Sequence, residues 1–102
     1  MRRIQRVYIS GPMTGYPELN FPAFHAAEDL LSPYYQVVNP ASLNPDVTTS
    51  RYTCLRVDLN ALCQCDALAL LPGWEHSPGA RREVENALAM GFIVAPLASF
   101  VS

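Results

Sequence analysis

The chain has 102 residues, of which half are hydrophobic and 16% are charged, and its formal net charge is -2. This length has room for one hydrophobic core, so we expect a single domain over residues 1–102, and the apolar composition argues against disorder. The charge excludes the basic surface that duplex nucleic acid requires, and no apolar run approaches the about 20 residues that span a membrane. Such low charge also predicts that apolar surface is covered in a homodimer or higher homo-oligomer.

The predicted elements alternate between strands and helices. In chain order they are a strand over residues 4–10, a helix over 21–31, a strand over 36–39, a helix over 50–64, a strand over 67–71, a helix over 78–90 and a strand over 92–96. Asn20 is a good N-cap for the first helix, and Ser77 followed by Pro78 is a typical start of the third. Residues 67–71 form a continuous apolar run, as buried parallel strands do. Residues 41–49 are predicted to form a loop.

This alternation predicts a three-layer α/β fold of the Rossmann or flavodoxin type. Its parallel sheet would have four to five strands with helices on both faces. Ligands of such sheets bind beyond the carboxyl ends of the strands, where the strand order reverses. The loops with that position are residues 11–15, the segment after Asn39 and residues 72–77. The sequence has no GxGxxG, GxxxxGK[ST] or GxSxG motif, so dinucleotide, P-loop and α/β-hydrolase functions lose their main support.

The three cysteines are an odd number without a spaced framework, which argues against a secreted disulfide scaffold. Cys63 and Cys65 are too close together for an ordinary disulfide or half of a zinc site, and both histidines lie far from them in sequence. We expect Cys54, Cys63 and Cys65 to be small buried hydrophobes in a reducing cytoplasm, and we expect no metal site. Strand-like sequence directly after the N-terminal arginines also argues against a signal peptide.

The start of the third helix has the features of an anion site. Ser77 is the N-cap, the first backbone N–H groups are free, and Gly79 lies in the first turn. Glycine costs helix stability relative to alanine, so Gly79 indicates close approach by a ligand or by a neighbouring backbone. The alternative interpretation is an ordinary capped helix with no ligand.

Two carboxylates flank the apolar faces of the second and third helices. Glu83 lies beside the face centred on Val84, from which it could point toward the mouth of a cleft. The alternative is a solvated glutamate. Asp58 lies at the edge of its helix's apolar face, where desolvation could raise its pKa. The alternative for Asp58 is an ion pair with Arg51 or Arg56.

Aromatic and apolar side chains accompany the expected cleft. Tyr8 lies near the end of the first strand, and its hydroxyl would need a partner if it is buried. A catalytic carboxylate would be such a partner, and a core aromatic is the alternative. Met13 and Trp74 lie in the cleft loops, where apolar or flat groups suit a stacked base. A role in the core or in an oligomer interface is the alternative for these two.

Three segments carry a family resemblance: YISGP at residues 8–12, CDALALL at residues 65–71 and SPGARREVENA at residues 77–87. They resemble the first strand, the third strand and the S-x-G-x-x-x-E-x-x-x-A motif of the nucleoside 2-deoxyribosyltransferase-like family, which includes the 2'-deoxynucleoside 5'-phosphate N-hydrolases. GPMTG at residues 11–15 and NFPAF at residues 20–24 resemble a small branch of that family found in phages and prophages.

The resemblance implies an N-glycosidase or 2-deoxyribosyltransferase that acts on a deoxynucleoside or its 5'-monophosphate without a cofactor. Glu83 matches the glutamate that attacks C1' and forms a glycosyl-enzyme ester. Asp58 matches the acid that contacts or protonates the departing base, and Tyr8 the tyrosine that orients the glutamate. Ser77 and Gly79 match the cap that receives the sugar 5' end. The family's transferases have Asp at the position of Ser77 and its phosphate-accepting hydrolases have Ser, which favours a 5'-monophosphate.

We therefore expect Tyr8, Asp58 and Glu83 to be catalytic. The expected substrate-binding residues are Ser10, Gly11, Met13, Trp74, Ser77 and Gly79. The chain departs from the family's pattern at Arg81 and Arg82, which replace small or apolar residues and either add phosphate contacts or mark a loss of activity. The alternatives to an enzyme are a nucleotide-binding module of the same fold without turnover, and a structural protein whose apolar surface serves assembly.

Overall fold

The computed structural model describes residues 4–43 and 51–101, and for residues 51–55 it describes the backbone alone. The strands are β1 (Arg6–Ser10), β2 (Gln36–Val38), β3 (Ala67–Leu70) and β4 (Ile93–Pro96). The α-helices are α1 (Phe21–Leu31), α2 (Pro40–Leu43), α3 (Arg51–Leu62) and α4 (Pro78–Ala89). The short 3-10 helices are η1 (Pro17–Asn20), η2 (Trp74–His76) and η3 (Leu97–Phe100). The predicted alternation is therefore confirmed.

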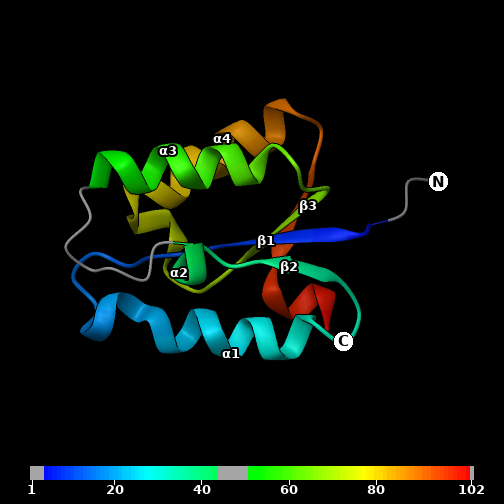
Figure 1. The fold of residues 1–102 in the computed structure, drawn as a ribbon, viewed down its shortest axis with the longest axis horizontal. Coiled ribbons are helices and arrows are strands. Elements are labelled where there is room, and N and C mark those ends of the chain that lie inside the picture. Colours follow the sequence, from blue (N-terminus) through cyan, green and yellow to red (C-terminus); the bar gives the residue numbers. More distant parts are fainter. Residues whose placement is uncertain (1–3, 44–50, 102) are drawn as a thin grey trace.

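The four strands of the described chain form one parallel sheet in the order β2-β1-β3-β4. Helices α3 and α4 cover one face of this sheet, and α1 with η3 covers the other (Figure 1). The three-layer α/β prediction is thus confirmed. The chain leaves β1 toward β2 and later returns past β1 to reach β3. The strand order therefore reverses between β1 and β3, the position at which such sheets bind ligands.

Two core clusters lie on opposite faces of the sheet because neighbouring residues of a strand point to opposite sides. Val7 and Ile9 are fully buried and pack in one cluster with Phe24 of α1. Tyr8 faces the other way and packs in the second cluster with Leu62 of α3 and with α4. All four residues of β3 are buried, as the continuous apolar run predicts. Within the described residues, no helix is long and apolar enough to cross a membrane.

The structure corrects the predicted loop after β2. Residues 40–43 form the short helix α2, and residues 44–49 of the predicted loop lie outside the described residues. The Asn39 side chain starts this helix, since its Oδ1 accepts a hydrogen bond from the Ala41 N–H at 3.0 Å. Proline is readily accommodated in a first helical turn, so the segment that follows the strand can turn directly into a helix.

The predicted role of Asn20 as a side-chain N-cap is wrong. Asn20 precedes α1 in a left-handed conformation with φ 63°, and its side chain makes no capping hydrogen bond. The two residues before it, Glu18 and Leu19, are also left-handed, so the chain enters α1 from an unusual direction. The Asn20 amide instead donates to the Pro12 carbonyl at 2.9 Å. This bond ties the loop after β1 to the start of α1.

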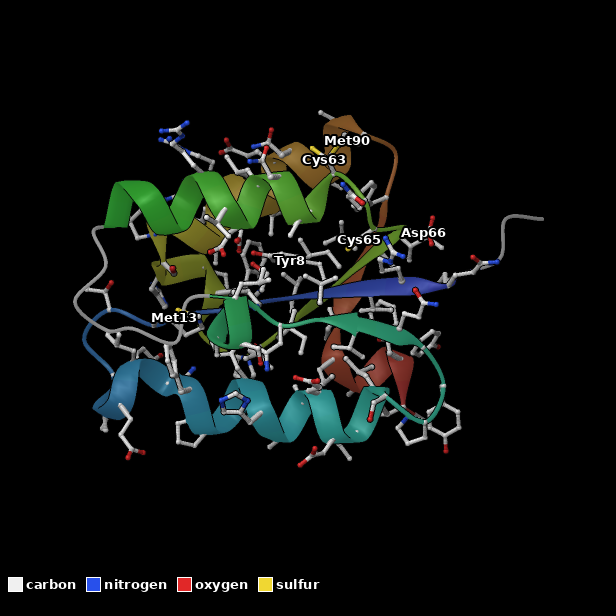
Figure 2. All side chains as sticks on the ribbon, in the orientation of Figure 1. Tyr8, Met13, Cys63, Cys65, Asp66 and Met90 are labelled. Carbon is white, nitrogen blue, oxygen red and sulfur yellow. The ribbon has the colours of Figure 1, made fainter. Side chains whose placement is uncertain are left out.

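The cysteine prediction holds at one of the two described side chains. Cys65 is buried, and burial raises the pKa of its thiol to about 11, so the thiol stays protonated at neutral pH. Cys63 is exposed, contrary to the prediction, because it follows the end of α3 and lies on the side of that helix away from the sheet (Figure 2). The Cys54 side chain lies outside the described part of the chain.

Candidate active site

A cavity of about 630 Å³ lies at the carboxyl ends of the strands. Its walls come from the loop after β1, from Pro40 after β2, from Asp58 of α3 and from the beginning of α4. These include the three loop regions that the sequence predicts at the ligand-binding edge of the sheet. The volume lies in the range of cavities that hold small ligands, and the cavity occurs where the strand order reverses.

Gly11 allows the loop after β1 to pack closely against the end of β3. A Cβ added at Gly11 would lie 2.7 Å from the Leu71 Cβ, which is closer than Cβ contacts occur in proteins. Leu71 is buried and its backbone N–H donates to the Ser10 carbonyl at 2.8 Å, so it has little freedom to move. A glycine is therefore required here by packing, and it brings the loop of residues 11–16 to the edge of the cavity.

Glu83 is a buried carboxyl at the wall of this cavity, with 6% of its surface exposed. Its Oε2 accepts a hydrogen bond from the Tyr8 hydroxyl at 2.5 Å, and its Oε1 accepts one from the Ser10 hydroxyl at 2.7 Å. Tyr8 and Ser10 are two residues apart on β1, so both face the layer of α3 and α4. Figure 2 shows Tyr8 between the sheet and those helices. The alternative of a solvated Glu83 is wrong.

The surroundings of Glu83 change its acidity. Burial raises the pKa of the carboxyl to about 8; the hydrogen bonds from Tyr8 and Ser10 oppose this rise, and the charge of Asp58 adds to it. Burial and the nearby Glu83 also raise the pKa of Tyr8 well above its usual value, so its hydroxyl remains a donor. At neutral pH most Glu83 carboxyls are therefore protonated, and the ionised form, which a nucleophilic role would require, is the minor one.

Asp58 shares the cavity with Glu83. It is partly buried on α3, and its charge contributes to the raised pKa of both Glu83 and Tyr8. The two acids from different helices thus lie close enough to interact electrostatically. Of its two predicted ion-pair partners, Arg56 is exposed and the Arg51 side chain lies outside the described residues.

The beginning of α4 forms one wall of the cavity. The Ser77 hydroxyl accepts a hydrogen bond from the Ala80 N–H at 3.2 Å, so the predicted N-cap is confirmed. Gly79 also lines the cavity, and a Cβ added there would meet no atom within 4 Å. Neither packing nor a left-handed backbone explains this glycine, in contrast to Gly11. Among the described residues, therefore, no neighbouring backbone accounts for Gly79, and the prediction that a ligand approaches it stays a prediction.

Replacing Gly79 by alanine should therefore stabilise the fold. Alanine favours a helix over glycine by up to about 1 kcal/mol, and the added methyl group has free space. Urea unfolding would measure a higher midpoint for Gly79→Ala than for the wild type. Gly11→Ala is the matched control and should be less stable than the wild type, because its methyl group would collide with Leu71. A destabilised Gly79→Ala would show that the glycine serves the fold.

The cavity brings together most of the predicted site. The predicted residues that line it are Gly11, Met13, Asp58, Ser77, Gly79 and Glu83. Ser10 is fully buried and contacts Glu83, so it does not line the cavity as predicted. Trp74 is also absent from the cavity wall: it packs against the core cluster of Tyr8 and lines a second, mainly apolar hollow with Leu97. Gly73, directly before η2, has a left-handed backbone with φ 88°.

Sequence reasoning misses several residues of the cavity wall. Phe24 has the spacing of a core residue on α1, and its burial agrees with that, yet it also borders the cavity. Hydrophobic periodicity identifies the apolar face of a helix, but it does not show whether protein side chains or a ligand cover that face. Pro40 and His76 also line the cavity. Their position directly after a strand, or directly before the Ser77 cap, is the signal that could have identified them.

In the part of the chain that the structure describes, no group of three or more His, Cys, Asp or Glu side chains could hold a metal ion.

The model of one protein family, described as "Domain of unknown function (DUF4406)", matches residues 5–95. No curated protein matches the chain.

Proposed function

The chain belongs to the DUF4406 family, and because that family's description assigns no function, we propose one from the cavity itself. The protein cleaves the N-glycosidic bond of 2'-deoxynucleotides, with Glu83 as the nucleophile. The observation that carries this proposal is the buried Glu83 carboxyl at the cavity wall, oriented by the hydroxyls of Tyr8 and Ser10. The sequence resemblance to the nucleoside 2-deoxyribosyltransferase-like family supports it independently.

The chemistry follows from the two acids. An ionised oxygen of Glu83 forms a bond to C1' of the sugar while the bond from C1' to the base nitrogen breaks and its electron pair moves to the base. Asp58 contacts the departing base, and the base nitrogen that receives the electron pair takes its proton from solvent. Water, or a second base in a transfer reaction, then forms a bond to C1' while the bond from C1' to the Glu83 oxygen breaks. The Glu83 carboxylate is released, and the proton of the attacking group passes to solvent.

The cavity offers a surface suited to each part of such a substrate. Met13, Phe24 and Pro40 provide apolar contact for a flat base. Asp58 and Glu83 provide the acids that the glycosidic bond requires. The open beginning of α4, with space beside Gly79, suits an anionic group at the 5' end, because helix N-termini attract anions.

The direct test is base release from the four 2'-deoxynucleoside 5'-monophosphates, followed by chromatography of the free base. The wild-type protein should release base from at least one of them. Glu83→Ala, purified in the same way, should release at least about a thousandfold less, since the nucleophile is removed. Absence of base release from all four substrates, or equal release by both proteins, would contradict the proposal.

A second function is favoured by one observation. The raised pKa of Glu83, about 8, leaves the carboxyl mainly protonated at neutral pH, which suits a hydrogen-bond donor to a bound nucleotide better than a nucleophile. The protein would then be a nucleotide-binding module of the same fold without turnover. In that case a deoxynucleotide should raise the melting temperature of both the wild type and Glu83→Ala, and neither should release base.

A further inference from the structure

The wall of the cavity contains a cation that the proposed chemistry does not use. Arg82 of α4 lines the cavity, whereas its neighbour Arg81 does not, although both side chains are exposed. Among the described residues of the cavity wall, Arg82 is the side chain that stays positively charged at every physiological pH. The remaining ionisable groups on the described wall are the carboxyls of Asp58 and Glu83, the imidazole of His76 and the phenol of Tyr16.

The geometry of α4 directs this charge toward the helix start. Arg82 lies three residues after Gly79 and four after Pro78, and both of these residues line the same cavity. Side chains at those spacings share a helix face, and long helical side chains point back toward the N-terminus. The guanidinium therefore extends toward the end of α4 that has the Ser77 cap and the space beside Gly79.

The Arg82 guanidinium is available for a ligand. Within the part of the chain that the structure describes, no carboxylate pairs with this guanidinium; the hydrogen bond from the Asn86 side chain at 2.8 Å goes to the Arg82 backbone carbonyl and leaves the guanidinium unaffected. A neutral ligand would gain little from a cation at this wall. A phosphate monoester presents oxygens that an arginine can bind in a bidentate manner, in addition to the backbone N–H groups of the helix start.

We propose that Arg82 determines specificity in this cavity, by selecting a deoxynucleotide with a 5'-monophosphate over the corresponding uncharged deoxynucleoside. This inference rests on the proposed function for the identity of the ligand. It also separates the two arginines that depart from the family's pattern: Arg82 contacts the phosphate, and Arg81 remains a solvated surface residue. At neutral pH, with Glu83 mainly protonated, Arg82 offsets the charge of Asp58, so the cavity does not repel a dianion.

The test measures binding, so that it does not depend on turnover. Calorimetry would give the Kd of a deoxynucleoside and of its 5'-monophosphate for the Glu83→Ala protein and for the same protein with Arg82→Ala or Arg81→Ala added. Arg82→Ala should weaken binding of the monophosphate on the order of tenfold to a hundredfold, the range for a hydrogen bond to a charged group. It should change binding of the deoxynucleoside less than about twofold, and Arg81→Ala should change neither. Added salt should reduce the preference for the monophosphate.

The outcomes separate this inference from the proposed function. Equal effects of Arg82→Ala on both ligands, no effect on either, or a matching effect of Arg81→Ala would overturn the role of Arg82 even if the wild-type protein releases base. If the wild type releases no base but Arg82→Ala selectively weakens monophosphate binding, the role of Arg82 holds and the proposed catalysis fails. Failure of both ligands to bind would overturn the inference and leave base release to be judged by its own assay.

Discussion

If Glu83 is the nucleophile, kcat/KM for the proposed base release should rise about fiftyfold between pH 6 and pH 8, because only the ionised carboxyl would react. Burial raises the pKa of Glu83 to about 8, so the ionised fraction grows from about 1% at pH 6 to about half at pH 8. An exposed glutamate would be fully ionised across this range and would give a flat profile. The pH dependence of kcat/KM measures this fraction in the free enzyme.

Ser10→Ala is the matched variant for this experiment. The hydrogen bond from Ser10 lowers the pKa of Glu83, so its removal should move the rise in kcat/KM to higher pH. The phosphate group of the substrate also titrates near pH 6, but it does so equally with both proteins, and the difference between the two profiles therefore reports on Glu83. A flat pH profile for the wild type, or coinciding profiles for the two proteins, would contradict the raised pKa of Glu83.

The free energy of unfolding should fall as the pH rises from 5 to 8, by about 1.4 kcal/mol per pH unit and about 4 kcal/mol in all from Glu83. In the unfolded chain the carboxyl has its ordinary pKa of 4.5, whereas in the folded protein its pKa is about 8. Between these values the folded state binds one more proton than the unfolded state. Stability contributed by this proton is complete below about pH 4.5 and is lost as the pH rises toward 8.

Urea unfolding of the wild type and of Glu83→Gln at several pH values would measure this effect. Glutamine keeps the size of the side chain and a carbonyl oxygen that can accept from a hydroxyl, but it does not titrate. All other groups titrate in both proteins, so the difference between the two unfolding free energies isolates Glu83. That difference should grow in favour of the glutamine variant as the pH rises. Parallel curves would show that Glu83 is not held protonated, whatever the protein's function.

Much of the fold is predictable from the sequence because its signals are local. The buried run of β3 and the Ser77 cap of α4 each depend on residues that are neighbours in the chain, and both predictions are confirmed. Asn20 shows the limit of such reasoning. It has the residue type of an N-cap, but three left-handed residues in succession rotate its amide toward the Pro12 carbonyl, and no local preference predicts that conformation.

The candidate site is less predictable, because its residues interact across the chain. Helical position alone leaves Glu83 equally compatible with solvent and with a cleft. Its burial is decided by Tyr8 and Ser10, whose contacts span 75 and 73 residues of sequence. Packing between elements also explains why Ser10 and Trp74 do not line the cavity, contrary to the prediction from sequence. Residue type and loop position cannot tell a side chain that faces the cavity from one that packs behind it.

The sequence by itself determined the three-layer α/β architecture and the edge of the sheet at which a ligand would bind. Both follow from the alternation of periods two and 3.6 along the chain, since each element must bury its apolar face against the next. The tertiary structure alone decided which polar groups meet at that edge. It placed Glu83 between two hydroxyls of β1, left the space beside Gly79 empty and turned Arg82 rather than Arg81 to the cavity. These placements depend on how the helices and strands pack against one another, and the hydrophobic periodicity of the sequence does not encode that packing.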